Sequence, residues 1–581
     1  MWREEDPREL LRSMSLEEKA GQVLMVGFRG KDAEGARPAI EKLKTGGVIY
    51  FARNTGYVAE TAALSQSLQR LAESATGIPL LISADQEGGI VSRLTQGLPD
   101  MPGPMALGAA DDEDLAFRVS RGIGIQLRAA GVNMDLAPVL DVNDNPENPV
   151  IGVRSFGSDP LRVAELGRAA VKGFLASGIA PVGKHFPGHG NTSVDSHLDL
   201  PVLDKSEEEL RMTELRPFSA AIASGLPAIM TAHIVFRALD PDHPATMSQK
   251  VLEGLLRRTM GFQGVILTDC LEMNAVSMSP GTPRAAVLAL KTGADLLLIS
   301  HTWGLQEEAL RQVVEAVRRG EVSEARLDEA VYRILSLKRR LGIPNPLETT
   351  AAHSEELRAL SREAHRRSIT LVRVEDGALP LGRPGSVQSG GTGAAVRVDQ
   401  TFGGTGAATR ADEAAGSTIP ALQTVEAACG AATEPPGILV VSATTGPGGP
   451  DGAVGPGAMS GAAGELARCL RQCGVRAATE IGAREALEMA ARAHAGDLRL
   501  VLLVQNAWKD EGQLSTARQL LQAFPDAVVV AVRDPYDARV LPQARTFLCS
   551  YGPRPGAMAA LAKVLTGADG PCGKLPVTLG F

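Results

Sequence analysis

The stretch from Lys184 to His197 concentrates side chains that can do acid–base chemistry. It holds three of the nine histidines of the chain, together with Asp195 and one lysine. The apolar run 178–182 leads into it and is typical of a buried strand. A helix cannot follow, because the stretch contains Pro187, Gly188 and Gly190. We therefore expect its polar side chains on a loop at the end of that strand, where folds commonly place chemistry.

Asp195 and His197 are separated by one residue, so both side chains can lie on the same side of an extended loop. A carboxylate beside an imidazole fixes its tautomer and raises its pKa. Such a histidine can donate a proton and later accept one. An ion pair on a surface loop is the non-catalytic alternative.

Asp269 directly follows the apolar run 264–268, where a carboxylate could attack an electrophilic carbon. Taken alone, an Asp after a strand is more often the N-cap of the next helix, here starting at Leu271. Lys184 and His185 could bind substrate hydroxyls or a carboxylate, or could fill the interior of the fold.

Two other chemistries fit the sequence less well. His185 and His189 have the spacing of zinc ligands on a helix, with Asp195 and His197 nearby. The intervening proline and glycine break such a helix, so we predict no metal and no other cofactor. A serine hydrolase would need a G-x-S-x-G elbow, which the chain lacks.

Strand-like and helix-like segments alternate through the first part of the chain. A capping box from Ser15 to Glu18 opens the first helix of the series, and later helices are expected near 60–73, 114–130 and 161–177. This alternation predicts a parallel sheet, and eight units suggest a closed (β/α)8 barrel of the TIM type. The eight apolar runs are 23–28, 47–51, 79–84, 132–139, 178–182, 228–232, 264–268 and 294–299.

Polar residues follow seven of the eight predicted strands. Barrel enzymes place their sites at this carboxyl-terminal rim, and solubility alone does not explain the regularity. The residues are Arg53 and Asn54, Asp85, Asp141, Lys184 and His185, His233, Asp269, and His301.

The barrel is expected to span residues 1–341, and residues 342–368 read as a linker and a connecting helix. Residues 369–581 predict a smaller α/β sandwich domain, with strands near 369–372, 437–442, 498–505, 527–532 and 545–550. The low-complexity stretches 382–418 and 443–464 lack a phosphate-binding motif and are expected to be surface loops.

Composition excludes several partners. The 581 residues carry a net charge of -8 without a basic cluster, so we expect no nucleic-acid partner. No apolar run is long enough to span a membrane, and the N-terminus lacks an apolar signal region. The six cysteines form no regular framework, which is typical of reduced thiols and predicts a cytoplasmic protein. We expect a monomer or a dimer.

The motifs together closely resemble glycoside hydrolase family 3, and within it the β-N-acetylglucosaminidase branch. The most specific match is Lys184-His-Phe-Pro-Gly-His-Gly190 followed by Asp195-Ser-His197. The resemblance extends over nearly the whole chain, through these segments: 47–51 with Arg53 and Asn54, 85–89, 137–141, 154–157, 268–273, 366–373 and 573–578.

The resemblance implies roles for individual residues. Asp269 would be the nucleophile of a retaining mechanism, and His197 with Asp195 would form the acid/base dyad. The residues expected to bind substrate are Asp85, Arg154, Lys184 and His185, with Arg93, His233 and Met273. The chain departs from the branch at Asn191 and Cys270, where aspartate is usual, and neither is a proposed catalytic group.

The expected activity is release of terminal N-acetylglucosamine from small glycosides, which the family implies to be muropeptide-like peptidoglycan fragments. Few aromatic residues, 4% of the chain, fit a small substrate better than a polymer. Three alternatives stay open: a phosphorylase of the same fold, a β-glucosidase or β-xylosidase, and a non-catalytic sugar-binding homologue.

Overall fold

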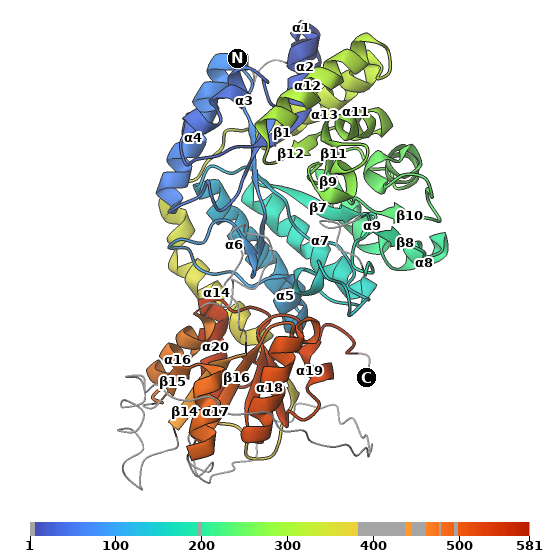
Figure 1. Cartoon of the computed structure of the whole chain (residues 1–581). Coiled ribbons are helices and arrows are strands. Elements are labelled where there is room, and N and C mark those ends of the chain that lie inside the picture. The colour runs from blue at the N-terminus through green and yellow to red at the C-terminus, as the bar shows by residue number, and fades with distance from the viewer. Residues whose placement is uncertain are drawn as a thin grey trace.

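The computed structural model describes residues 6–193, 200–381, 437–443, 461–475, 478–492 and 498–579. These residues form two α/β parts that follow one another along the chain, coloured blue to green and orange to red in Figure 1. The first part contains an eight-stranded sheet and the second a six-stranded sheet. The predicted two-part α/β architecture is therefore confirmed.

The eight-stranded sheet has only parallel pairings and runs in the order β11-β9-β7-β6-β3-β2-β1-β12. Its edge strands meet through a parallel bridge between Leu267 and Leu296, so the sheet is a nearly closed barrel. The strands are β1 (Leu24–Gly27), β2 (Gly47–Tyr50), β3 (Leu81–Ala84), β6 (Met134–Asp135), β7 (Ala180–Phe186), β9 (Ala228–Thr231), β11 (Val265–Thr268) and β12 (Leu297–Ile299).

Helices between these strands surround the barrel. Their ends carry the expected signals: Ser15 forms the predicted capping box with Glu18, and Asp112 and Asp159 cap two long helices. The α- and π-helices with more than four residues are α1 (Pro7–Ser13), α2 (Leu16–Gln22), α3 (Arg37–Glu41), α4 (Val58–Thr76), α5 (Pro104–Ala110), α6 (Glu113–Ala129), α7 (Pro160–Ser177), α8 (Glu207–Met212), α9 (Leu215–Ala223), the π-helix η4 (Lys250–Thr259), α11 (Thr282–Thr292), α12 (Trp303–Arg318) and α13 (Glu324–Leu341).

All eight predicted barrel strands are present, but one of them is longer than the sequence indicated. Strand β7 continues through Lys184 and His185 to Phe186, so the expectation that these polar residues lie on a loop was wrong. The apolar run ends at Val182, yet the strand continues because its backbone stays paired. Lys184 N donates to Pro138 O at 3.2 Å, and the register with β9 resumes at Phe186.

The second part is a sheet between two layers of helices. Its strand order is β13-β18-β17-β16-β14-β15, parallel except for β13 against β18. The strands are β13 (Thr370–Arg373), β14 (Gly437–Ser442), β15 (Ala478–Ile481), β16 (Leu498–Val504), β17 (Val528–Ala531) and β18 (Thr546–Cys549). The helices are α14 (Glu355–Ser368), which leads into the sheet, α16 (Ala462–Gln472), α17 (Ala483–Arg492), α18 (Glu511–Ala523), α19 (Asp537–Val540) and α20 (Pro555–Leu565).

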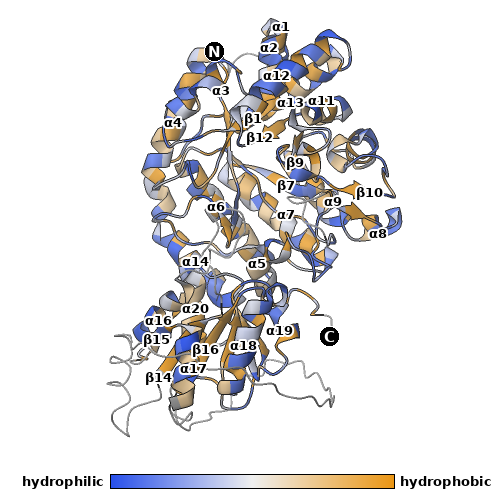
Figure 2. Ribbon diagram, viewed as in Figure 1, coloured by the Kyte–Doolittle hydropathy of each residue, from blue (hydrophilic) through white to orange (hydrophobic). Residues whose placement is uncertain are grey.

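Burial follows this layering. Helices α16 and α20 pack on one face of the second sheet, and α17 and α18 pack on the other. Figure 2 shows the strands of this sheet as mostly hydrophobic, as expected for strands covered on both faces. In the part of the chain that the structure describes, no helix combines the length and apolar character needed to cross a bilayer.

The two parts share a hydrophobic core. Met105, Ala106 and Ala109 of α5, with Val153 of the barrel, join the cluster beneath one face of the second sheet. The C-terminal segment returns to the barrel as well, where Lys574 N donates to Ala109 O at 2.8 Å. The second part therefore covers the side of the barrel where α5 and the loop after β6 lie.

Candidate active site

Five charged side chains from the barrel rim form one continuous chain of ion pairs. Lys184 Nζ lies 2.7 Å from Asp85 Oδ1 and 2.8 Å from Glu87 Oε1. Arg154 donates to both oxygens of Glu87, from Nε at 2.9 Å and from Nη2 at 2.7 Å. Arg93 Nη2 approaches Asp85 Oδ2 at 3.7 Å. The predicted substrate-binding residues Asp85, Arg93, Arg154 and Lys184 are thus brought together, with Glu87 between two of them.

Burial makes the pairing of these charges necessary. Lys184 and Glu87 are only 1% and 6% exposed. Burial by itself would raise the pKa of Glu87, but the positive charges of Arg154 and Lys184 outweigh it and lower that pKa. Burial would likewise lower the pKa of Lys184, and the carboxylates of Asp85 and Glu87 reverse the direction. Glu87, Arg154 and Lys184 are therefore charged at neutral pH.

His185 is held by a carboxylate below the rim. Asp141 Oδ2 lies 2.7 Å from His185 Nδ1, and Asp141 Oδ1 accepts from the backbone N–H groups of His185 and His189. Asp141 is fully buried, and burial would raise its pKa, but the neighbouring His185 lowers it. This arrangement fixes the tautomer of His185 and leaves Nε2 as the ring nitrogen able to face a ligand.

Asp269 follows β11, two strands from β7 in the order of the barrel, and its side chain is half-buried. Its Oδ1 accepts from Cys270 N at 2.7 Å. His233 is buried, and its ring reaches Thr246 Oγ1 at 2.8 Å and donates from Nε2 to Cys270 O at 3.1 Å. His233 therefore holds the backbone next to Asp269, and the substrate contact expected of it stays a prediction.

Cys270 keeps its proton at neutral pH. Burial raises the pKa of this thiol to about 11. Met273, also expected to bind substrate, precedes the short helix α10 (Asn274–Ser277) with a half-buried side chain. Other rim residues serve the scaffold: Arg53 donates to the carbonyl oxygens of Phe28 and Ser300.

The predicted acid/base pair, Asp195 and His197, lies outside the described residues. The segment just before it is well anchored. Asn148 Nδ2 donates to His189 O at 2.8 Å and to Thr192 O at 3.0 Å. Asn191 Nδ2 donates to Asp144 Oδ1 at 2.7 Å. An aspartate at position 191, which is usual in the branch that the sequence resembles, would repel Asp144 instead.

Three functional features were not recognised from the sequence. Glu87 lies within the quoted Asp85-to-Gly89 motif, and its position two residues after Asp85 was the available signal. Asp141 was noted as a rim residue without a role. The second part contributes Tyr536, whose hydroxyl accepts from Asn143 Nδ2 at 2.8 Å, and no local signal in the sequence could have predicted that contact.

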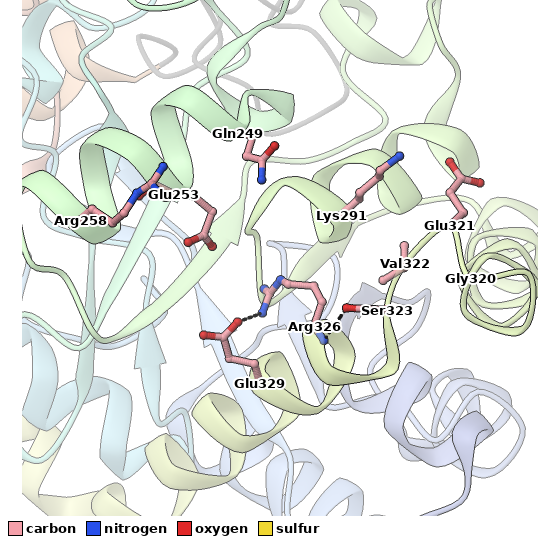
Figure 3. A pocket seen from close by; sticks show the side chains of 10 residues that line it. All are labelled: Gln249, Glu253, Arg258, Lys291, Gly320, Glu321, Val322, Ser323, Arg326 and Glu329. Atoms are coloured by element: carbon pink, nitrogen blue, oxygen red, sulfur yellow. Dashed lines mark hydrogen bonds and ion pairs between the residues drawn. The ribbon is translucent and has the colours of Figure 1, made fainter.

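A cavity of about 470 Å³ opens elsewhere on the barrel (Figure 3). It lies beside the turn between α12 and α13, where Arg326 donates to Asp295 just before β12. This is the amino-terminal end of the barrel strands. Because the candidate residues lie at the opposite end, we assign this cavity no part in the chemistry. It is lined by Gln249, Glu253, Arg258, Lys291, Gly320, Glu321, Val322, Ser323, Arg326 and Glu329.

Comparison with known proteins agrees with the barrel fold. The model of the glycosyl hydrolase family 3 N-terminal domain matches residues 15–337. Beta-hexosaminidase A of Pseudoalteromonas piscicida is 35% identical over 406 residues, which are 62% of this chain and 67% of that protein.

Two solved structures are similar to different extents of the chain. A glycoside hydrolase family 3 β-N-acetylglucosaminidase from Paenibacillus sp. str. FPU-7 is 37% identical with a TM-score of 0.82, covering 98% of this chain and 99% of that one. A β-N-acetylhexosaminidase from Beutenbergia cavernae is 34% identical with a TM-score of 0.53, covering 56% of this chain and 99% of that one. Since the family model spans more than half of its length, the chain belongs to glycosyl hydrolase family 3.

Proposed function

We propose that this chain is a retaining β-N-acetylglucosaminidase that releases terminal N-acetylglucosamine from small glycosides. The observation that carries the proposal is the charged cluster at the barrel rim, on the same rim as Asp269. Its paired side chains offer fixed donors and acceptors to sugar hydroxyls without leaving a buried charge unpaired. The relatives named β-hexosaminidase or β-N-acetylglucosaminidase support an N-acetylated sugar as the substrate.

The first chemical step of the proposal forms a covalent intermediate. A carboxylate oxygen of Asp269 attacks the anomeric carbon, and the bond from that carbon to the leaving oxygen breaks. His197, protonated and held by Asp195, gives its proton to the leaving oxygen. This is the first displacement of a retaining glycosidase, with imidazole in place of the usual carboxylic acid.

The second step releases the sugar. Neutral His197 accepts a proton from water, whose oxygen attacks the anomeric carbon, and Asp269 leaves as a carboxylate. Two inversions give net retention of configuration. His185, oriented by Asp141, and the Asp85–Lys184 pair would hold the sugar during both steps. The sequence of steps needs no metal or organic cofactor.

The proposed natural substrates are peptidoglycan fragments, as the family resemblance implies. A phosphorylase is the second candidate, because the proposed acid/base group is a histidine and not a carboxylic acid. A histidine becomes neutral after giving up its proton, whereas a carboxylate becomes negative and would repel a phosphate dianion. Hydrolysis is preferred because water is always present.

The test is an assay of chromogenic glycosides that differ only in the sugar. The wild type should prefer the N-acetylglucosaminide over the glucoside and xyloside, and Asp269→Ala should abolish turnover without loss of the fold. Equal rates for wild type and Asp269→Ala would refute the assignment. If millimolar phosphate makes N-acetylglucosamine 1-phosphate the main product, the acceptor is phosphate and the two residues keep their roles.

A further inference from the structure

The cavity at the amino-terminal end of the barrel strands lies between three helices and is separate from the candidate active site. Residues of η4, α11 and α13 line it, together with the turn after α12. Its volume of about 470 Å³ falls in the range of small-molecule sites, roughly 300–1,000 Å³. Six of its ten lining residues are charged, so a ligand that fits it must be polar.

Helix η4 presents three polar side chains to this cavity. It is a π-helix, in which backbone bonds join residues five apart, as from Met260 N to Leu255 O at 2.9 Å. Gln249, Glu253 and Arg258 follow one another at spacings of four and five residues. This helix type therefore brings them to one face, and Figure 3 shows all three around the cavity. π-Helical turns are rare and occur frequently at functional sites.

Two carboxylates of the lining are already matched by arginines. Glu321 accepts from both Nη atoms of Arg284, at 2.9 and 2.6 Å. Glu329 pairs with Arg326 at 3.0 Å and with Arg333 at 2.5 Å. These contacts hold the walls of the cavity in place, but they leave little charge on the two carboxylates to attract a ligand.

Lys291, Arg258 and Glu253 differ, because their charged groups are not used in ion pairs. Within the range of residues that the structure describes, none of the three has an oppositely charged group at ion-pair distance. Arg258 uses its Nε alone, which donates to Glu253 O at 3.3 Å. The lining therefore offers two cations and one carboxylate to an occupant of the cavity.

The surroundings of the cavity are positive, although the chain as a whole carries a net charge of -8. Asp295 lies behind the lining and is fully buried. It pairs with three arginines, Arg257 at 2.5 Å, Arg326 at 2.6 Å and Arg333 at 3.1 Å. With the groups described above, the cluster contains six cations and four carboxylates. This excess of positive charge favours an anion that carries two charges.

We propose that this cavity binds the phosphate group of a small hydroxylated molecule, such as a sugar phosphate. A phosphate monoester carries nearly two negative charges at pH 7, and Lys291 and Arg258 are suited to receive it. Its hydroxyl groups would donate to Glu253, whose carboxylate would otherwise repel an anion. The inference goes beyond the proposed function and does not depend on it, because this cavity and the catalytic rim lie at opposite ends of the barrel.

The test is calorimetric titration of the full chain with glucose 6-phosphate and with inorganic phosphate at constant ionic strength. Variants K291M and R258M each remove one cation of the lining. K172M is the matched control, since Lys172 is an exposed lysine of α7, outside the cavity, with no ion pair to any described residue. Lys291 and Arg258 are also exposed, so the variants should fold, and thermal unfolding checks this.

K291M and R258M should each bind glucose 6-phosphate about tenfold more weakly than the wild type, as expected for loss of one charge-assisted hydrogen bond. K172M should bind it as the wild type does. Equal binding by all three variants would place the ligand elsewhere, for example at the catalytic rim, and would overturn the inference. Binding is measured without turnover, so the result is independent of the assigned activity.

E253Q tests whether the ligand carries hydroxyl groups. The wild type should bind glucose 6-phosphate more tightly than inorganic phosphate. Removal of the Glu253 charge should strengthen the binding of inorganic phosphate and reduce the preference for the sugar phosphate, because the hydroxyl acceptor is weakened. A wild type that binds inorganic phosphate at least as tightly as glucose 6-phosphate, or an E253Q variant with an unchanged preference, would contradict the proposed ligand class.

Discussion

Glu87 connects two cations that would otherwise repel each other inside the rim. Its two oxygens are shared between Arg154 and Lys184, and its side chain is almost inaccessible to solvent. A group in this position does not need to touch the sugar to matter. It fixes the direction in which both cations point, and so determines how they can meet hydroxyl groups.

Replacement of Glu87 by Gln should therefore lower both stability and activity. The variant keeps the shape but removes the charge that compensates Arg154, which should cost roughly 3 kcal/mol in the free energy of unfolding. The measurement is urea unfolding together with KM for the N-acetylglucosaminide, which should rise. Asp114→Asn is the control, because it breaks only an exposed pair with Arg118 and should cost less than about 1 kcal/mol. Similar losses in the two variants would contradict this account.

His189 should make stability depend on pH. Burial, followed by the nearby charge of His185, lowers the pKa of His189 from 6.5 to about 4. Above pH 6.5 neither the folded nor the unfolded state binds this proton, and between pH 6.5 and 4 only the unfolded state does. Stability is therefore full above pH 6.5 and is lost as the pH falls, by about 3 kcal/mol in total.

His189→Gln should lack this contribution. Urea unfolding at pH 7 and at pH 4.5 should show a smaller loss for the variant than for the wild type. Since all other titrating groups are common to both proteins, the difference isolates His189. Identical losses would show that His189 is not held neutral in the folded protein.

At the scale of elements, the short helix η2 (Gly152–Arg154) links the two parts of the chain to the site. Gly152 has φ +45°, and a Cβ atom there would lie 2.3 Å from Asp534 Oδ1. Glycine is needed at this position for both the backbone and the contact. The approach of the second part and the orientation of Arg154 therefore depend on the same three residues.

Gly152→Ala should loosen the docking and raise KM for the glycoside. Gly77→Ala is a matched control: Gly77 has φ +70° with no atom within 4 Å of the added Cβ. Both variants should lose about 1 kcal/mol from backbone strain, but only Gly152→Ala should change KM. Adding Asp534→Ala should relieve the clash and partly restore stability. An unchanged KM in Gly152→Ala would contradict the link between docking and the site.

At the scale of the whole molecule, the sequence predicts the architecture better than the site. All eight barrel strands were predictable because each is a short apolar run, and polar residues follow seven of them. Strand β15 was missed because it lies at the edge of its sheet and half of its four residues, Thr479 and Glu480, are polar. The end of β7 was missed because its last residues are held by backbone pairing, which hydrophobicity does not report.

The candidate site was predictable where a motif marks it and not elsewhere. Asp85, Lys184 and Arg154 lie in recognisable segments, and the structure brings them into one cluster. Asp534 meets Val153 of the barrel across some 380 residues of sequence, a contact that follows only from the packing of the second part on the barrel. The role of His233 in holding the backbone of Cys270 likewise depends on geometry that its position after a strand cannot reveal.

The covalent intermediate on Asp269 tests the central claim most directly. An activated N-acetylglucosaminide with fluorine at C5 slows both steps, because fluorine destabilises the oxocarbenium-like transition state, while a good leaving group keeps the first step accessible. The measurement is mass spectrometry of the peptides after incubation with this compound. The account predicts one glycosyl group on the peptide that contains Asp269, bound through its carboxylate. A label on a different residue, or turnover that inverts the anomeric configuration without any label, would contradict it.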